Sequence, residues 1–239
     1  MRPYLFTAIP LFCLFSLMQN NEAMKRPSAT QTCEEDVSDK ACVPFPISNE
    51  LLNQWRNSTA STNFKKALDR IAQGDSVFIL TDVGWFIDSE INCMISIFPH
   101  ITTVALDNYD ILPAQMVRLI EALKHNGRVV TLSLKNTNTG YESAGSISDM
   151  LQHNDTLKKL YLSHNHIGAR GARLICEGIQ NNPNSALIEL NLRYNQISLK
   201  DTLAIYSPLI KLRPGITLYS EYPEICATSA TPSAPKERS

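Results

Sequence analysis

Apolar residues recur along the second half of this chain with a fixed internal spacing and a nearly constant period. Each copy of this cassette reads apolar-x-x-apolar-x-apolar, and the copies start at positions 101, 129, 157 and 187. Their apolar residues are Ile101, Val104, Leu106; Val129, Leu132, Leu134; Leu157, Leu160, Leu162; and Leu187, Leu190, Leu192. A period of 28 to 30 residues predicts a solenoid, in which each unit is too small to bury its own apolar side and stacks on its neighbours.

The end of each cassette alternates between core and surface positions, as in a short strand that is buried on one side. Leu160 and Leu162 should therefore face the core, with Tyr161 on the opposite side. On this interpretation Leu160→Asp is severely destabilising, whereas Lys159→Asp, one residue away, is nearly silent for folding.

Asparagine follows two of the strands where the chain must turn. The side chains of Asn165 and Asn195 can hydrogen-bond the backbone groups of a tight bend, so we expect them to form a ladder from coil to coil. Tyr109 and Thr137 occupy this position in the first two copies, and neither substitutes fully for asparagine. The ladder should therefore be broken in those two coils.

The third and fourth copies, residues 157–167 and 187–197, match the pattern L-x-x-L-x-L-x-x-N-x-L at every fixed position, with isoleucine last. Over residues 101–221 the chain therefore resembles the leucine-rich repeat family. A 28-residue unit with a full helix is similar to the ribonuclease-inhibitor subtype. The resemblance implies an α/β fold, a right-handed α/β solenoid with a helical N-terminal cap and a concave strand face.

Each strand is followed by apolar or small residues at i, i+3/i+4 and i+7, which is the spacing of one helix face. These residues are Met116, Leu119, Ile120, Leu123; Ala144, Ile147, Leu151; Gly171, Ala172, Ile175, Cys176, Ile179; and Thr202, Ile205, Leu209. Asn126, Asn154 and Asn182 lie in segments suited to ending three of these helices.

A fifth strand is expected over residues 216–218 at the end of the repeats. Ile216 and Leu218 follow Leu190 and Leu192 by 26 residues, and no helical pattern follows. This arrangement is typical of a last, truncated coil.

A degenerate coil or cap strand is expected upstream of the repeats. Val77 precedes Ile101 by 24 residues, and residues 87–98 have the apolar pattern of a helix. Residues 48–72 should form two short helices that cover the first coil, because an uncovered solenoid end exposes core.

The N-terminus has the features of an export signal. Residues 4–18 form an uncharged apolar run after Arg2, which is short for a membrane span but suits the core of a signal peptide. An uncleaved anchor or a buried first helix are the alternatives. The expected organisation is a signal peptide over 1–23, a polar linker over 24–47, a cap with the degenerate coil over 48–100, leucine-rich repeats over 101–226 and a disordered tail over 227–239.

Composition and cysteine usage add few functional constraints. The 22 Lys and Arg residues nearly balance the 23 Asp and Glu residues, so the chain has no electrostatic footprint for nucleic acid. Cys33 and Cys42 could close a small loop in an oxidising compartment, whereas Cys176 should be a core thiol.

No catalytic or cofactor-binding motif stands out, so we expect neither enzyme activity nor a cofactor. His164 and His166 flank Asn165 as a metal-binding pair would, but both fall at variable surface positions of the repeat. We therefore predict no metal site.

The concave strand face is the remaining candidate for function. The assumed register places Tyr161 in one row with Thr217, and Arg193 in the next row with Tyr219. Large side chains with polar groups, which are enriched at interface hot spots, gather in its C-terminal half. The predicted partner-binding residues are Lys159, Tyr161, His164, Glu189, Arg193, Tyr194 and Tyr219.

We therefore expect a non-catalytic protein-binding module whose partner is a protein. Its expected export makes it similar to repeat proteins that bacteria secrete or deliver into host cells. The alternative is a cell-envelope structural protein anchored by residues 4–18, and only in that case is membrane contact expected.

Overall fold

The computed structural model describes residue 53 and residues 60–80 and 84–222. All of them belong to the second of two compact units, Val43–Ser239. The predicted signal peptide, the polar linker with Cys33 and Cys42, the first cap helix and the tail over 227–239 lie outside the described residues.

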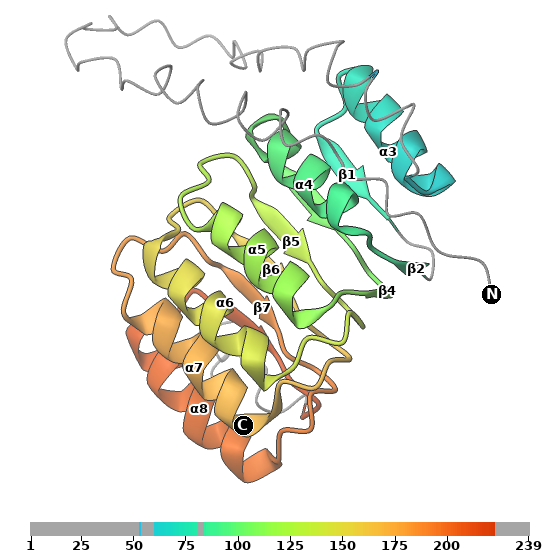
Figure 1. The fold of residues 1–239 in the computed structure, drawn as a ribbon. Coiled ribbons are helices and arrows are strands. Elements are labelled where there is room, and N and C mark those ends of the chain that lie inside the picture. The colour runs from blue at the N-terminus through green and yellow to red at the C-terminus, as the bar shows by residue number, and fades with distance from the viewer. Residues whose placement is uncertain (1–52, 54–59, 81–83, 223–239) are drawn as a thin grey trace, which may run out of the picture. The chain divides into compact units, whose positions relative to one another are not determined.

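Six short strands form one parallel sheet in the order β1-β3-β5-β6-β7-β8 (Figure 1). Their bounds are β1 Val77–Ile79, β3 Thr103–Ala105, β5 Thr131–Ser133, β6 Lys159–Tyr161, β7 Glu189–Asn191 and β8 Thr217–Tyr219. Each of the four cassettes supplies one strand, and the predicted fifth strand is β8. A parallel sheet whose successive strands alternate with helices confirms the predicted α/β fold class.

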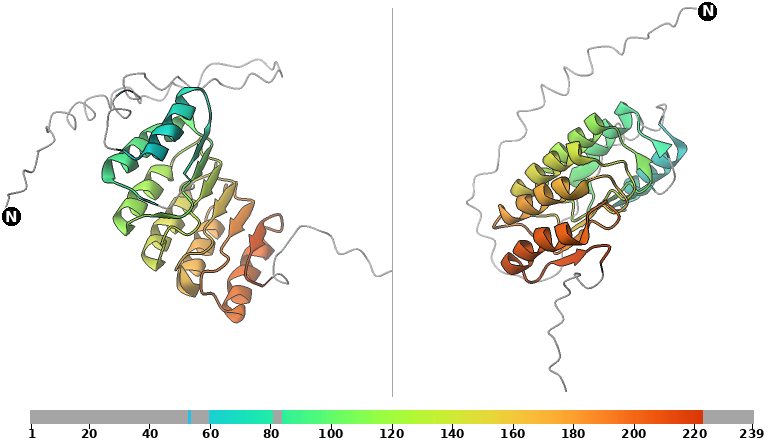
Figure 2. Two further views of the ribbon diagram at one scale, coloured as in Figure 1. Left: turned by 90° about the vertical axis from the view of Figure 1, so that its right-hand side faces the viewer. Right: turned by 90° about the horizontal axis from the view of Figure 1, so that it is seen from below.

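Helices form a layer along one side of this sheet, as the views in Figures 1 and 2 show. Their bounds are α3 Thr62–Ala72, α4 Asp88–Ile97, α5 Pro113–Leu123, α6 Tyr141–His153, α7 Gly168–Gln180 and α8 Leu199–Leu212, with a 3₁₀ helix η2 at Phe98–His100. A second, two-stranded parallel sheet pairs β2 Gly84–Trp85 with β4 Tyr109–Asp110. Every residue predicted for the helix faces of α5 to α8 is buried, which confirms those faces.

The space between the helices and the sheet is filled by one continuous apolar core. All the apolar cassette residues are at most 3% exposed. The parallel pairing aligns Val104, Leu132, Leu160 and Leu190 in register, so each coil covers the leucine of the coil before it. At the N-terminal end, α3 contributes Phe64, whose ring stands edge-on to that of Phe78 in β1 at 5.5 Å.

The asparagine ladder forms where it was predicted. The Asn165 amide donates to Leu162 O in its own coil and to Leu134 O in the preceding coil. Asn195 repeats this pattern one coil later. Thr137 donates only to the carbonyl of its own coil, at Leu134, so threonine replaces half of the asparagine bridge.

The interruption in the first coil has a different form. Tyr109 is buried, and its ring stacks on Phe86 with the centroids 4.7 Å apart. An apolar contact therefore takes the place of the hydrogen-bonded bridge there, and the expectation that the ladder is broken in the first two coils is confirmed.

A second asparagine ladder lies at the bend that leads from helices to strands, and sequence analysis missed it. Asn154 donates to Leu123 O and Asn126 O, and Asn182 donates to Leu151 O and Asn154 O. These residues were interpreted only as helix stops. Arg213 ends this ladder by donating to the carbonyl oxygens of Asn182 and Ser185.

Two register assignments from the sequence were wrong by two residues. Val77 pairs with Thr103, so β1 precedes β3 by 26 residues, whereas the sequence alignment placed Val77 beside Ile101. Leu218 pairs with Leu190, at a separation of 28, which moves Tyr219 into the row of Asn191 and Tyr161. The outward residues of β8 therefore change places relative to the predicted rows.

Two further observations concern the helices. None of the described helices combines the length and apolarity that a membrane span requires. Cys176 is a buried free thiol on α7, as predicted, and its burial, reinforced by the nearby Glu177 carboxylate, raises the pKa of the thiol to about 12.

Candidate functional site

The outward residues of the strands form a continuous surface, which we call the sheet face. In β6, β7 and β8 the central residue of each strand is buried and its two neighbours are partly exposed. One row consists of Thr103, Thr131, Lys159, Glu189 and Thr217, and the other of Ala105, Ser133, Tyr161, Asn191 and Tyr219. The predicted division between core and surface side chains is therefore confirmed.

Glu189 is the centre of a network on this face. Lys159 Nζ lies 3.2 Å from Glu189 Oε2 in the neighbouring strand, and the hydroxyl groups of Tyr161 and Tyr219 interact with the same carboxylate. Burial alone would raise the pKa of Glu189, but these three groups together hold it below its usual range. Conversely, burial and then the Glu189 charge raise the pKa of Tyr161 to about 12.

This arrangement corrects one expectation about Lys159. The sequence predicted that Lys159→Asp would be nearly silent, because the residue faces outward. In the structure that substitution would bring a second carboxylate beside Glu189, and like charges on neighbouring strands are destabilising.

Each of the two tyrosine rings also has a cation over its face. Lys135 Nζ lies 5.2 Å from the Tyr161 ring centroid, and Arg193 Cζ lies 5.4 Å from that of Tyr219. Lys135 is additionally ion-paired with Asp107 at 3.3 Å. Cation–π contacts of this kind contribute about 0.5–1 kcal/mol at exposed sites, so both rings are restrained at the hydroxyl and at the ring face.

Arg193 is itself held in place by the backbone. Its Nε donates to Ser220 O at 3.0 Å, while its guanidinium carbon lies over Tyr219. Binding sites gain affinity when large side chains are ordered before the partner arrives, because less conformational entropy is lost on binding. The network therefore provides a restrained, partly exposed pair of aromatic rings, which suits the binding of another protein surface.

Five of the seven predicted site residues belong to this network, and His164 and Tyr194 do not. Both follow a strand and have left-handed backbone angles, with φ of 58° and 57°. Their rings stack on each other with centroids 4.3 Å apart. No cluster of His, Cys, Asp or Glu suited to a metal ion occurs in the described part of the chain.

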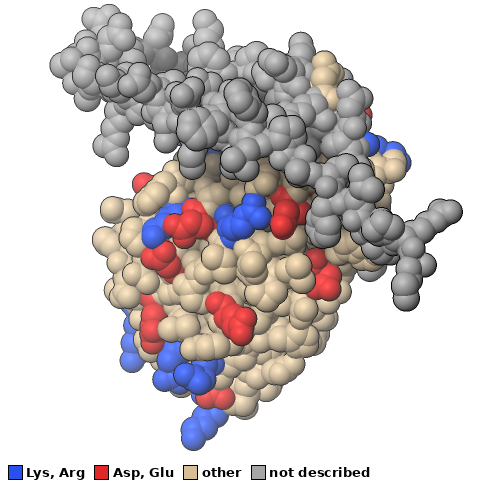
Figure 3. All heavy atoms as spheres, in the orientation of Figure 1, with Lys and Arg blue, Asp and Glu red and all other residues tan. Residues whose placement is uncertain are grey.

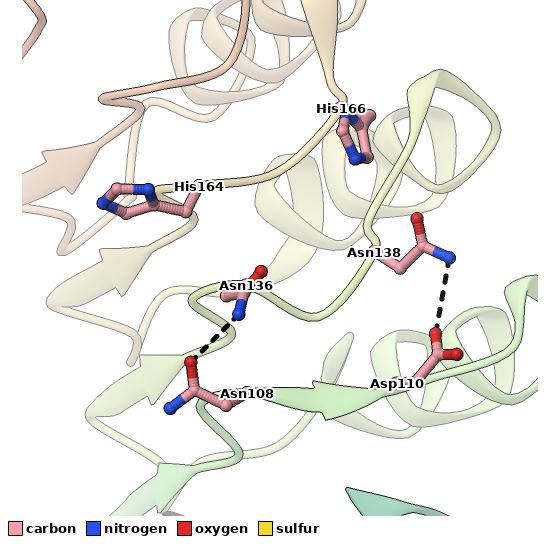
Figure 4. Close-up of a pocket in the computed structure, with 6 residues that line it drawn as sticks. All are labelled: Asn108, Asp110, Asn136, Asn138, His164 and His166. Atoms are coloured by element: carbon pink, nitrogen blue, oxygen red, sulfur yellow. Dashed lines mark hydrogen bonds between the residues drawn. The ribbon is translucent and has the colours of Figure 1, made fainter. Parts of the chain in front are cut away.

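The structure adds a polar pocket beside the sheet face that the sequence analysis did not identify. It has a volume of about 280 Å³ and is lined by Asn108, Asp110, Asn136, Asn138, His164 and His166 (Figure 4). The available signal was the 28-residue spacing that relates Asn108 to Asn136 and Asp110 to Asn138. These positions were noted only as variable surface or were not considered.

The opposite, helical side has a different character. In Figure 3, which views the molecule from the side of the helices, basic and acidic side chains are interspersed. Ion pairs such as Lys124–Asp149, at 2.6 Å, link neighbouring helices there. This side therefore presents no patch of a single charge.

Comparisons with known proteins agree with this geometry. The family model described as "Leucine Rich repeat" matches residues 153–176, which contain the third cassette. No curated protein sequence matches the chain. Together with the repeated strands and helices, the family match identifies the chain as a leucine-rich repeat protein.

Two solved structures are similar to this chain. One is titled "Leiomodin-1 Actin-Binding Site 2 (ABS2)"; it is 28% identical, covers 57% of this chain and 79% of that chain, and has a TM-score of 0.51. The other is titled as the tropomodulin C-terminal domain of Caenorhabditis elegans; it is 12% identical, covers 69% and 87% of the two chains, and has a TM-score of 0.46.

Proposed function

We propose that this protein is a binding module that recognises a protein partner through its sheet face. The observation that carries the proposal is the network centred on Glu189, in which Tyr161 and Tyr219 are restrained at both hydroxyl and ring. Restrained tyrosines beside an arginine are the composition of interface hot spots. The proposed contact residues are those predicted from the sequence, with Lys135 added.

Actin is the first partner to test. The leiomodin-1 structure, whose title names an actin-binding site, shares 28% identity with this chain over the matched region. A repeat scaffold fixes geometry and leaves specificity to its variable positions, so this likeness supports actin as a candidate and the sheet face determines whether it binds.

The test is co-sedimentation of the full chain with purified actin filaments, with the affinity measured for the wild type and for a Tyr161→Ala, Tyr219→Ala double variant. We expect the double variant to bind about a hundredfold more weakly, since two hot-spot side chains are lost. Tyr141→Ala is the matched control, because Tyr141 is also an exposed tyrosine beneath a cation, Arg170, but lies on α6. Equal affinity of the double variant and the wild type, with both folded by circular dichroism, would reject the sheet face, and no binding by the wild type would reject actin.

Two finer assignments are also proposals. The 28-residue spacing of Leu132, Leu160 and their neighbours, with a full helix in each coil, supports the ribonuclease-inhibitor-like subtype. The apolar run over residues 4–18 supports export, including delivery as a secreted effector. N-terminal sequencing of the mature protein tests export: a start near Met24 supports it, and an intact Met1 in the membrane fraction supports the anchored alternative.

A further inference from the structure

The pocket beside the sheet face has an unbalanced set of hydrogen-bonding groups. Asn136 donates its side-chain N–H to Asn108 Oδ1 at 3.1 Å, and Asn138 donates to Asp110 Oδ1 at 3.3 Å (Figure 4). Both amides thus spend a donor within the wall of the pocket. In the described part of the chain, the carbonyl oxygens of Asn136 and Asn138 and the second oxygen of Asp110 accept no hydrogen bond.

The charge of the pocket is also uncompensated. Asp110 has no ion-pair partner among the described residues, and the lining contains neither lysine nor arginine. Gln196 Nε2 donates to His166 Nδ1 at 3.0 Å, so a neutral His166 carries its proton on Nε2. The pocket therefore combines one free carboxylate oxygen with two free amide oxygens, which suits a cationic donor and disfavours an anion.

The backbone beneath the pocket is fixed before any ligand arrives. Asn108 N donates to Lys135 O at 2.9 Å, Asn136 N to Ser163 O at 3.0 Å, and His164 N to Arg193 O at 2.9 Å. The parallel hydrogen bonding of the sheet thus continues past the strands. Asn108, Asn136 and Asn138 have φ of 67°, 53° and 58°, a left-handed conformation that asparagine tolerates better than most residues.

The position of the pocket connects it with the proposed interface. Asn108 and Asn136 directly follow Asp107 and Lys135, which belong to the network on the sheet face. A partner that covers the network therefore reaches the pocket as well.

From this geometry we propose that the pocket binds the guanidinium or ammonium group of a basic side chain on the protein partner, an inference that rests on the proposed function for the identity of the ligand as part of a protein. The Asp110 carboxylate supplies the charge, and the Asn136 and Asn138 carbonyl oxygens accept further N–H groups. The His164 ring closes one side of the site.

The test uses two peptides that differ at one position, Gly-Ser-Arg-Ser-Gly and the same peptide with citrulline in place of arginine, both blocked at their ends. Citrulline keeps the shape of arginine but is neutral. Each peptide is titrated into the full chain, and NMR shifts of the Asn138 and His166 amides report binding at the pocket. We expect saturable shifts with the arginine peptide and a dissociation constant about tenfold or more weaker with the citrulline peptide.

Three variants complete the test. Asp110→Asn removes the charge but keeps the acceptor for Asn138, and it should weaken arginine-peptide binding about tenfold or more. Asp155→Asn, the same change at an exposed aspartate outside the pocket lining, should leave binding unchanged. Asn136→Asp adds a second carboxylate and should tighten binding, which keeps the proposal testable if Asp110→Asn fails to fold.

Equal binding of the two peptides, shifts that lie away from the pocket, or unchanged binding by folded Asp110→Asn would each overturn the proposal. The outcome is separable from that of the proposed function, because the peptides report only on the pocket. Loss of actin binding in the sheet-face variants does not bear on it.

Discussion

Asn165 connects three stretches of backbone that have no other means of being satisfied. Its Oδ1 accepts from the backbone N–H groups of Thr137 and Thr139, and its Nδ2 donates to carbonyl oxygens in two successive coils. The side chain is 2% exposed, so water cannot take over these bonds. Buried polar groups that lose their partner are costly, and asparagine at this position is therefore a structural requirement of each tight bend.

Asn165→Ala should lower the free energy of unfolding by about 3 kcal/mol, because several buried backbone groups lose their partner at once. Asn165→Thr should lose roughly half as much, since Thr137 shows that a hydroxyl still serves the carbonyl of its own coil. Urea denaturation followed by circular dichroism measures both. Asn184→Ala, an exposed asparagine, is the control, and equal stability of all four proteins would contradict the role of the ladder.

The Glu189 network should make stability depend on pH. The pKa of Glu189 is held below its ordinary value of 4.5 in the folded protein, so the network stabilises the fold above pH 4.5 and this contribution is lost as the pH falls through the lower, folded-state value. Glu189→Gln cannot titrate. Melting temperatures measured from pH 7 down to pH 3 should therefore fall less steeply for Glu189→Gln than for the wild type, and parallel curves would show that Glu189 is not coupled to folding.

At the scale of elements, the closest approach between neighbouring helices is set by glycine. A Cβ built on Gly178 of α7 would lie 2.5 Å from Ser148 O of α6, and 2.9 Å from Ser148 Cα. Both are backbone atoms, which cannot rotate away. Gly145 of α6 has no atom within 4 Å of the equivalent Cβ position, so the two glycines have different reasons to be present.

Gly178→Ala should destabilise the protein by about 1–3 kcal/mol, because α6 and α7 must move apart. Gly145→Ala should instead stabilise it by about 0.5–1 kcal/mol, because alanine has less backbone freedom to lose in the unfolded chain. Thermal or urea denaturation of the two variants gives the sign directly. A change of the same sign in both would refute the close approach of α6 and α7.

At the scale of the whole molecule, stability is shared between neighbouring coils. Every strand from β3 to β7 pairs with one strand on each side, whereas β8 pairs only with β7 among the described strands. In such an array each unit is stabilised mainly by its interfaces with adjacent units. Damage in the middle therefore weakens two interfaces, and damage at the end weakens one.

Leu160→Asp should lower the free energy of unfolding by about 4 kcal/mol or more, because it buries an unpaired charge between two coils. Leu218→Asp, in β8, should be milder and should increase hydrogen exchange chiefly in β7, β8 and α8. Lys158→Asp, at an exposed position next to β6, is the control for the charge and should change stability by less than about 0.5 kcal/mol. Equal losses for Leu160→Asp and Leu218→Asp would contradict a stability that is shared coil by coil.

The repeat spacing alone was sufficient to predict the architecture. Burial is decided locally by which residues are apolar, so the cassettes predicted the strands, the helix faces and the inward leucines correctly. The same reasoning identified Tyr161, Glu189 and Arg193 as outward residues of neighbouring strands. These predictions follow from periodicity, because each unit repeats the same short-range pattern.

Register, pairing and polar partners were decided only in the tertiary structure. The turns before β3 and β8 differ in length from those of the regular repeats, so Val77 and Leu218 were each misplaced by two residues. Glu189 meets two tyrosines and a lysine, and Asp110 keeps an unpaired oxygen, only because side chains about 28 residues apart in sequence stack at the spacing of neighbouring strands. A sequence pattern fixes which side of a strand a residue occupies, but the distance between two side chains depends on how the coils are stacked.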